Sequence, residues 1–265
     1  MATIVFFHAH PDDEAIATGG TMAKMASEGH RVVLVTATRG ELGEVPEGAL
    51  KDGETLGEVR EKELAAASRA LGVSRLEFLG YRDSGMLGES TNEDSDSFWQ
   101  ADLEEASGRL ASILEEENAQ VLTTYDEHGG YGHPDHVQVH RVGVRAAEIA
   151  KTPLVFLATP NRDAIRDLMS RAEEFGVDAP EGVDLDLETF GEPAERITTG
   201  VDVSGFLESK RQAMRAHSSQ IAESSFFLAM PDEAFAAIWG TEYFIRLGAE
   251  KADEMETSLL DGLPA

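Results

Sequence analysis

The chain has 265 residues, 42% of them hydrophobic, which is enough apolar material for one large domain or a domain with a small appendage. Its 22 Lys and Arg face 50 Asp and Glu, and the resulting net charge of −28 disfavours binding to nucleic acids and to anionic membrane surfaces. There is no cysteine, so disulfides and thiolate metal sites are excluded, and no apolar run approaches the roughly 20 residues of a membrane helix.

Short, continuous apolar runs alternate with helix-like stretches through the first part of the chain. The runs predict strands that are covered on both faces, at residues 3–7, 31–37, 75–80, 120–125 and 153–159. The stretches between them predict helices at residues 13–29, 57–73, 101–119 and 133–150. This alternation predicts an α/β fold with a doubly wound, mostly parallel, Rossmann-like sheet and helices on both faces.

After Pro160 the alternation weakens, and we expect a smaller C-terminal α+β portion. Its expected elements are a helix at 161–176, an acidic loop at 177–195, a strand at 196–203, a helix at 204–217 and a helix–strand pair within 232–246. We therefore expect residues 1–160 to form the catalytic core with a metal site. Residues 161–250 would complete the same domain and the substrate pocket, and residues 251–265 would form a tail.

Polar clusters follow the first four predicted strands, each at the point where the strand ends. They are "HAHPDDE" (8–14), "TRGELGE" (38–44), "YRDSGM" (81–86) and "YDEHGGYGHPDH" (125–136). In an open α/β sheet this carboxyl edge is where ligands bind. The first turn carries carboxylates in place of a phosphate-binding G-x-G-x-x-G, which argues against a dinucleotide. Gly19 and Gly20 come later, inside the helix, and we interpret them as close-packing residues.

Two H-P-D motifs at one sheet edge, in a chain without cysteine, predict a divalent metal site. Each proline would occupy the first position of a helix and hold the turn before it rigid. A catalytic site needs about three protein ligands and an open position for water. The candidate ligands are His10, Asp12, Asp13, His133, Asp135 and His136, and the spacing alone does not say which Asp binds.

Other ligand sets and metals remain open at this point. His133, His136 and His140 have helical spacing and could form a site on one helix face. Two imidazoles and one carboxylate also suit non-haem Fe(II), although such oxygenases usually have a different, double-stranded β-helix fold. Zn²⁺ is the expected cofactor, with Fe²⁺ as the alternative.

The segments "AHPDDE" and "GGYGHPDH", together with "GELGE", "RDSGM" and "TYDE", resemble the PIG-L/LmbE-like family of zinc-dependent N-acetylglucosaminyl deacetylases. The resemblance covers residues 3–150 and returns weakly at "RAHSSQI" (215–221). Within the family, the chain is most similar to the actinobacterial mycothiol deacetylase and mycothiol S-conjugate amidase. Gly132 favours the deacetylase, whereas "TYDE" and "EGHRV" favour the amidase.

The resemblance implies a role for each of ten residues. It implies metal ligands His10, Asp13 and His136, a general base at Asp12, and an oxyanion-stabilising or acidic His133 that Tyr131 assists. It further implies that Asp135 tunes the histidines and that the substrate is bound by Glu44, Arg60 and Asp83.

We therefore expect a metal-dependent hydrolase that removes an acetyl group from an N-acetylglucosamine-type sugar or its conjugate. Metal-activated water would attack the amide while Asp12 takes the proton. The alternatives are an amidase of a glucosaminyl conjugate, a non-catalytic sugar-binding α/β module, and a glycosidase using carboxylates such as Asp12 and Asp83. A small-molecule amino sugar is the expected partner, and homo-oligomerisation is left open. With no signal-peptide pattern, we expect a cytoplasmic protein.

Overall fold

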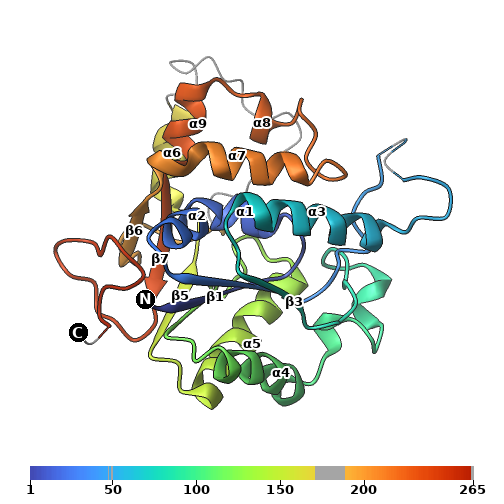
Figure 1. The fold of residues 1–265 in the computed structure, drawn as a ribbon, viewed down its shortest axis with the longest axis horizontal. Coiled ribbons are helices and arrows are strands. Elements are labelled where there is room, and N and C mark those ends of the chain that lie inside the picture. Colours follow the sequence, from blue (N-terminus) through green and yellow to red (C-terminus); the bar gives the residue numbers. More distant parts are fainter. Residues whose placement is uncertain (47, 49, 171–188, 264–265) are drawn as a thin grey trace.

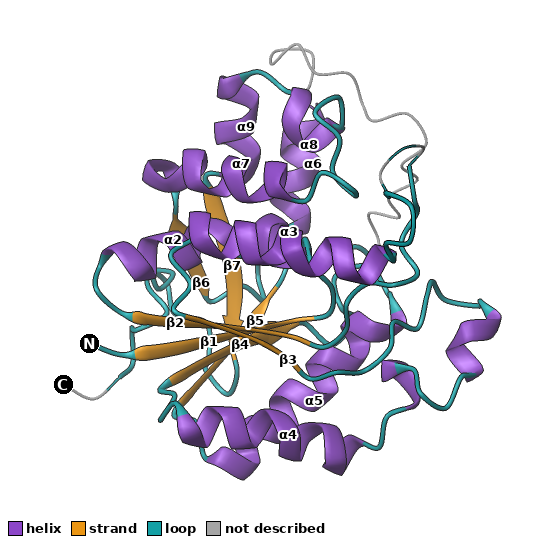
Figure 2. Ribbon diagram, turned by 45° about the vertical axis from the view of Figure 1, so that its right-hand side comes forward, coloured by secondary structure: helices purple, strands orange, loops and turns teal. Residues whose placement is uncertain are grey.

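The computed structural model describes residues 1–46, 48, 50–170 and 189–263. Within them, seven strands form one sheet in the order β3-β2-β1-β4-β5-β7-β6 (Figures 1 and 2). The five parallel strands are β1 (Thr3–His8), β2 (Arg31–Thr36), β3 (Arg75–Phe78), β4 (Val121–Tyr125) and β5 (Leu154–Ala158). The antiparallel strand β7 (Thr241–Arg246) joins β5 to β6 (Thr199–Asp202). The predicted α/β, mostly parallel sheet is confirmed, and the C-terminal portion extends this same sheet.

Helices cover both faces of the sheet. One face carries α1 (Asp13–Ala17), α2 (Gly19–Ser27) and α3 (Leu56–Ala70), and the other carries α4 (Leu103–Glu116) and α5 (Pro134–Ala150) (Figure 1). Helix α7 (Leu207–Ala216) packs on the outer side of α1, α2 and α3. Around α7 lie α6 (Arg162–Ser170), α8 (Phe226–Ala229) and α9 (Asp232–Trp239). The C-terminal helices therefore form a third layer of helices, on the outer side of α1, α2 and α3.

The central strands are buried from end to end, as their continuous apolar sequences predict. All five residues of β4 and of β5 are buried, as are the last five residues of β1. Because both faces of these strands are covered, their backbone is rigid. The loops that follow β1 and β4 are therefore anchored to the most rigid part of the molecule.

The predicted helix at 13–29 is wrong in one respect, because it is two helices broken at Thr18. The Thr18 hydroxyl lies 2.9 Å from His8 Nε2, so a side chain of β1 draws this turn onto the sheet. The interpretation of Gly20 as a close-packing residue is confirmed: a Cβ on Gly20 would lie 2.6 Å from Val203. The short helix α8 was not predicted.

Two further segments bear on the C-terminal expectations. Residues 177–188 of the predicted acidic loop lie outside the described residues. The predicted tail contacts the sheet: the Glu256 carbonyl accepts a hydrogen bond from the Gly200 amide (2.9 Å), and Leu259 is fully buried.

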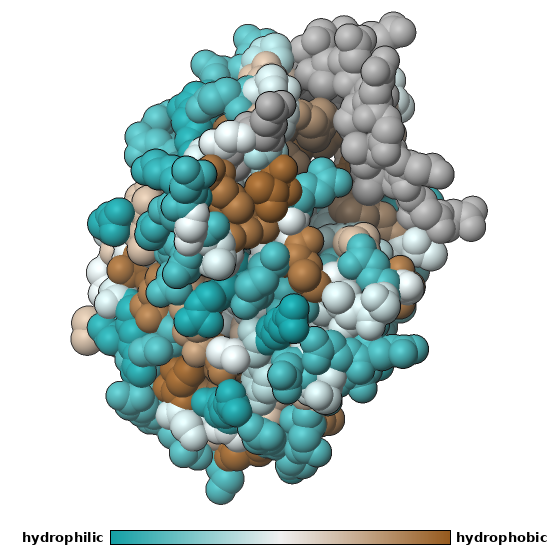
Figure 3. All heavy atoms as spheres, turned by 90° about the vertical axis from the view of Figure 1, so that its right-hand side faces the viewer, coloured by the Kyte–Doolittle hydropathy of each residue, from teal (hydrophilic) through white to brown (hydrophobic). Residues whose placement is uncertain are grey.

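Hydrophilic residues predominate on the face seen in Figure 3, and hydrophobic ones form scattered patches. Large exposed apolar side chains include Leu42 and Val45 after β2, and Met86 and Leu87 after β3. In the part of the chain that the structure describes, every helix is too short or too polar to cross a bilayer.

Candidate metal centre and active site

The candidate site lies where the order of strands in the sheet reverses. From β1 the chain continues outward to β2 and β3 on one side, and β4 and β5 lie on the other. Loops that leave β1 and β4 therefore diverge and open a crevice at the carboxyl edge, the usual ligand position in such sheets. His10 and Asp13 follow β1, and His136 follows β4 in the first turn of α5.

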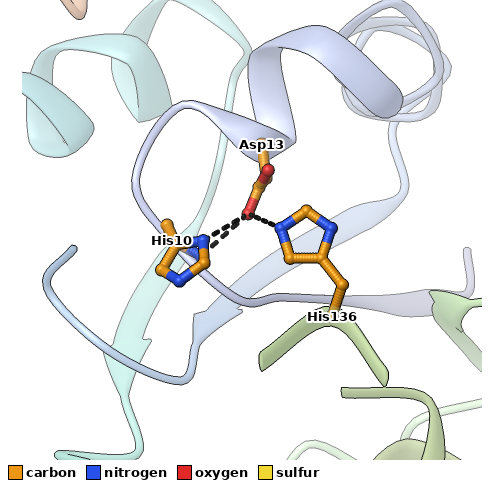
Figure 4. A group of neighbouring side chains, drawn as sticks. All are labelled: His10, Asp13 and His136. Atoms are coloured by element: carbon orange, nitrogen blue, oxygen red, sulfur yellow. Dashed lines mark hydrogen bonds and ion pairs between the residues drawn. The ribbon is translucent and has the colours of Figure 1, made fainter. Parts of the chain in front are cut away.

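Two histidines approach one carboxylate oxygen from different sides (Figure 4). Asp13 Oδ2 lies 3.4 Å from His10 Nδ1 and 3.4 Å from His136 Nε2. The three donor atoms lie within 4.8 Å of one another, and both histidines are buried. Two imidazole nitrogens and one carboxylate oxygen are a common donor set for a catalytic divalent metal.

Hydrogen bonds orient both imidazoles so that each presents a lone pair to this point. His136 Nδ1 donates to the Gly129 carbonyl (3.1 Å), which leaves Nε2 unprotonated, and this buried atom has no hydrogen-bond partner. In the neutral ring, His10 Nε2 donates to Asp135 Oδ2 (3.1 Å) and Nδ1 is free to coordinate. With both rings neutral, the two lone pairs face one carboxylate oxygen, and a metal ion between the three atoms would bind all of them, so these residues fit a metal.

The charges around His10 favour a cation as well. Burial opposes protonation of His10, but the carboxylates of Asp13, Asp135 and Asp83 outweigh it and raise its pKa well above the usual value. Burial likewise opposes ionisation of Asp13, but His136 and His10 hold its pKa well below the usual value. Three carboxylates around one imidazole leave an excess of negative charge that a divalent ion would neutralise.

A second group, His10, Asp83 and His133, is also close enough to hold an ion. Its hydrogen bonds fit one less well, because His133 Nδ1 accepts from the Asp135 amide (3.1 Å). In the neutral ring Nε2 then carries the proton and is a donor. Burial, with His10 and His136 nearby, lowers the pKa of His133 to about 4, so the ring is neutral at pH 7. The all-helix set is not brought together, since His140 Nδ1 donates to the Tyr125 carbonyl instead (2.9 Å).

Asp12 occupies the turn between β1 and α1 in an unusual backbone conformation. Its φ of 111° lies in the left-handed region, which costs a non-glycine residue about 1–3 kcal/mol. Burial raises the pKa of Asp12 to about 6, although the Arg60 guanidinium, 3.2 Å away, opposes this shift. The expectation that each proline begins a helix is confirmed for Pro134 but wrong for Pro11, because α1 begins at Asp13.

The three predicted substrate-binding residues have different environments. Arg60 is buried against the Asp12 turn, where it donates to the carbonyls of Gly40 (2.8 Å) and Pro11. Asp83 is buried and its Oδ1 lies 3.6 Å from His10 Nε2. Glu44 is exposed on the loop after β2. Asp83 and Arg60 therefore contact His10 and the Asp12 turn, whereas the exposed Glu44 has its carbonyl bonded to Gln220.

Tyr131 lies on the glycine-rich loop after β4. Its ring is 4.9 Å from that of His136 and 6.3 Å from that of His133, and its side chain is half exposed. Burial of the hydroxyl and the nearby carboxylates raise the pKa of Tyr131, so it remains a donor at neutral pH. Gly129 (φ 63°) brings this loop against α5: a Cβ there would lie 2.4 Å from His136 Cβ.

Two residues without a predicted role support the site. The Ser84 amide (3.0 Å) and hydroxyl both donate to Asp135, so this carboxylate is fixed while it orients His10. The Tyr125 ring lies 4.9 Å from the His136 ring, and its hydroxyl lies 2.8 Å from His8 Nδ1. Ser84 belongs to the "RDSGM" cluster, which pointed to the right loop. Nothing in the sequence indicates that Asp135 pairs with His10 in preference to its neighbour His136.

Comparisons with known proteins identify the family and the fold. The family model PIG-L, described as GlcNAc-PI de-N-acetylase, matches residues 5–147. A 1D-myo-inositol 2-acetamido-2-deoxy-alpha-D-glucopyranoside deacetylase of Thermomonospora curvata is 42% identical, with 98% of this chain and 97% of the relative covered. A deacetylase of the teicoplanin biosynthesis pathway has the same fold (TM-score 0.63, 19% identity, 92% and 97% covered). So does the zinc-inhibited form of a teicoplanin deacetylase (TM-score 0.61, 20% identity, 94% and 100% covered). The chain therefore belongs to the PIG-L family.

Proposed function

We propose that this protein is a metal-dependent N-deacetylase that hydrolyses the acetamide of an N-acetylglucosamine linked to inositol, releasing acetate and the free amine. The inositol-linked sugar is the substrate in the name of the 42% identical relative, which aligns over nearly the whole chain. The observation that carries the proposal is the approach of His10 Nδ1 and His136 Nε2 to one Asp13 oxygen, beside Asp12.

His10, Asp13 and His136 would hold the metal, with zinc as our assignment and Fe²⁺ as the alternative. When bound, a divalent metal lowers the pKa of water and polarises a carbonyl. Asp12 adjoins ligand Asp13 in the chain, and as a carboxylate above its pKa of about 6 it takes the proton of the attacking water.

The remaining steps would use His133, Tyr131 and Asp12. Neutral His133, with its proton on Nε2, donates to the oxyanion that develops on the amide carbonyl, and the Tyr131 hydroxyl assists. The leaving amine takes the proton that Asp12 has accepted, because the His133 ring is neutral at pH 7 and is not an acid for this step. Asp83 and Glu44 are our candidates for contacts to the sugar or inositol. Arg60 acts through the Asp12 turn that it contacts.

The test is release of free amine from N-acetylglucosaminyl-inositol and from plain N-acetylglucosamine. We expect turnover of the inositol conjugate with zinc, loss of turnover after chelation, and recovery on adding metal back; metal analysis of the purified protein identifies the ion. Asp12→Asn keeps a side chain that tolerates positive φ and should lower kcat by about 10²–10⁴.

Three results would contradict the proposal. Metal-independent release of inositol with the acetamide intact would favour a carboxylate-based glycosidase. Full activity of Asp12→Asn would show that Asp12 is not the general base. Cleavage of a mycothiol S-conjugate without deacetylation of the inositol sugar would make the protein an amidase.

A further inference from the structure

A buried ion pair joins the C-terminal portion to the turn that carries Asp12. His217, directly after α7, places Nε2 2.6 Å from Glu14 Oε1, and both side chains are fully buried. The two residues are 203 positions apart in the sequence. Burying such a pair is costly, and replacing it with apolar side chains is often neutral or stabilising, so stability alone does not account for it.

The second oxygen of Glu14 is bonded to the Asp12 backbone. Glu14 Oε2 accepts a hydrogen bond from the Asp12 amide (2.9 Å), so one carboxylate connects His217 with Asp12. Asp12 has the left-handed φ of 111°, which persists only where the surroundings impose it. Glu14 supplies that restraint, and His217 holds Glu14 in place from outside the turn.

The residues after His217 contact the helix that carries Arg60, the second residue that contacts Asp12. The Ser219 amide (2.8 Å) and hydroxyl (2.6 Å) donate to Glu63 on α3, the helix that also carries Arg60. Arg60 in turn contacts the Asp12 carboxylate (3.2 Å). The segment from His217 to Ser219 therefore contacts Glu14, which bonds the Asp12 backbone, and the helix that carries Arg60.

We propose that His217 is a positioning residue for the general base, acting through Glu14 to hold Asp12 in its reactive orientation. The proposal rests on the proposed function, in which Asp12 takes the proton of water. It gives a role to the "RAHSSQI" segment, which lies beyond the residues 5–147 that the family model matches.

The test is the separation of kcat from KM in His217 variants at saturating metal. His217→Leu removes the donor to Glu14 and should lower kcat about 10²-fold, the typical cost of a misplaced catalytic group, with KM and bound metal within about twofold of the parent. His217→Gln, whose amide can still donate to Glu14, should restore kcat to within about fivefold.

A matched control lies on α7, the helix that ends just before His217. Lys210 of α7 pairs with Glu242 at the same 2.6 Å, and both are buried, but neither contacts Asp12. Lys210→Met should lower the thermal midpoint as His217→Leu does while leaving kcat near the parent value. If His217→Leu does not fold, Glu14→Gln serves as the background because it leaves no unpaired buried charge. The kcat of Glu14→Gln/His217→Leu should lie well below that of Glu14→Gln, and equal kcat values would contradict the role of His217.

Either of two results for His217→Leu would overturn this role: a kcat within threefold of the parent, or an effect that appears mainly in KM. An equal drop in the kcat of Lys210→Met, or a kcat of His217→Gln as low as that of His217→Leu, would overturn it as well. If the unsubstituted protein does not deacetylate the substrate, the proposed function fails and not this inference alone.

Discussion

Asp12 is subject to two opposing influences. Burial favours its neutral form and raises its pKa to about 6, while Arg60, itself buried, favours the carboxylate. A metal bound to the neighbouring Asp13 would favour the carboxylate further. The base is active when ionised, so activity is full above its pKa and falls as the pH drops through it.

We therefore predict that kcat/KM has an acid limb at or below pH 6, and that Arg60→Gln moves this limb to higher pH. Loss of the guanidinium removes the group that most favours the ionised form of Asp12. The measurement is kcat/KM against pH for both proteins. Arg39→Gln is the control, because Arg39 is paired with Glu61 (2.9 Å) and its loss should leave the limb in place. If the acid limb of the Arg60→Gln profile lies at the same pH as that of the parent, the assignment of Asp12 as the base is contradicted.

Much of the candidate site could be predicted from the sequence, because strand ends and H-P-D motifs are local signals. The strand ends placed the candidate ligands at one sheet edge, and His10, Asp13 and His136, the set that the family resemblance implies, do meet there. The partner of each group could not be predicted. Arg60 contacts Asp12 and Glu14 contacts His217 because helices pack on one another, and such pairings over long sequence distances leave no local pattern.

Among the helices, α2 approaches the end of β6 so closely that only a glycine fits. We predict that Gly20→Ala destabilises the protein by about 1–3 kcal/mol, since its Cβ would lie 2.6 Å from Val203. Gly108 is the matched control: it also lies in a helix, α4, but a Cβ there has nothing within 4 Å. Gly108→Ala should stabilise the protein by about 0.5–1 kcal/mol. Denaturant unfolding measures both, and equal effects of the two substitutions would refute the packing argument.

The helices and strands themselves were predictable where burial is uniform. Strands β1, β2, β4 and β5 agree with their apolar runs because both faces are covered, whereas the edge strand β3 is only half-buried. Helices α4 and α5 have clear apolar faces. The break at Thr18 was not predictable, because it depends on a contact with His8 across the sheet edge. The division of the chain at residues 160 and 250 stays a prediction.

Over the whole molecule, a net charge of −28 makes the folded state repel itself. We predict that the thermal midpoint rises with NaCl between low salt and about 1 M, where the Debye length falls to about 3 Å. Near pH 4.5, the isoelectric point given by the sequence, the same salt should give little gain. Thermal unfolding at both pH values is the measurement, and a salt response that is equal at the two would rule out charge repulsion as its cause.

The position of β7 between β5 and β6 has a consequence for synthesis on the ribosome. All three candidate metal ligands have been translated once residue 136 is added, yet Phe156 of β5 gains its pairing partner only with Arg246. Until then the nascent chain carries an unpaired strand edge, which is the kind of surface that recruits other strands. This edge of β5 therefore stays unpaired while the 90 residues that follow Phe156, up to Arg246 (246 − 156), are translated.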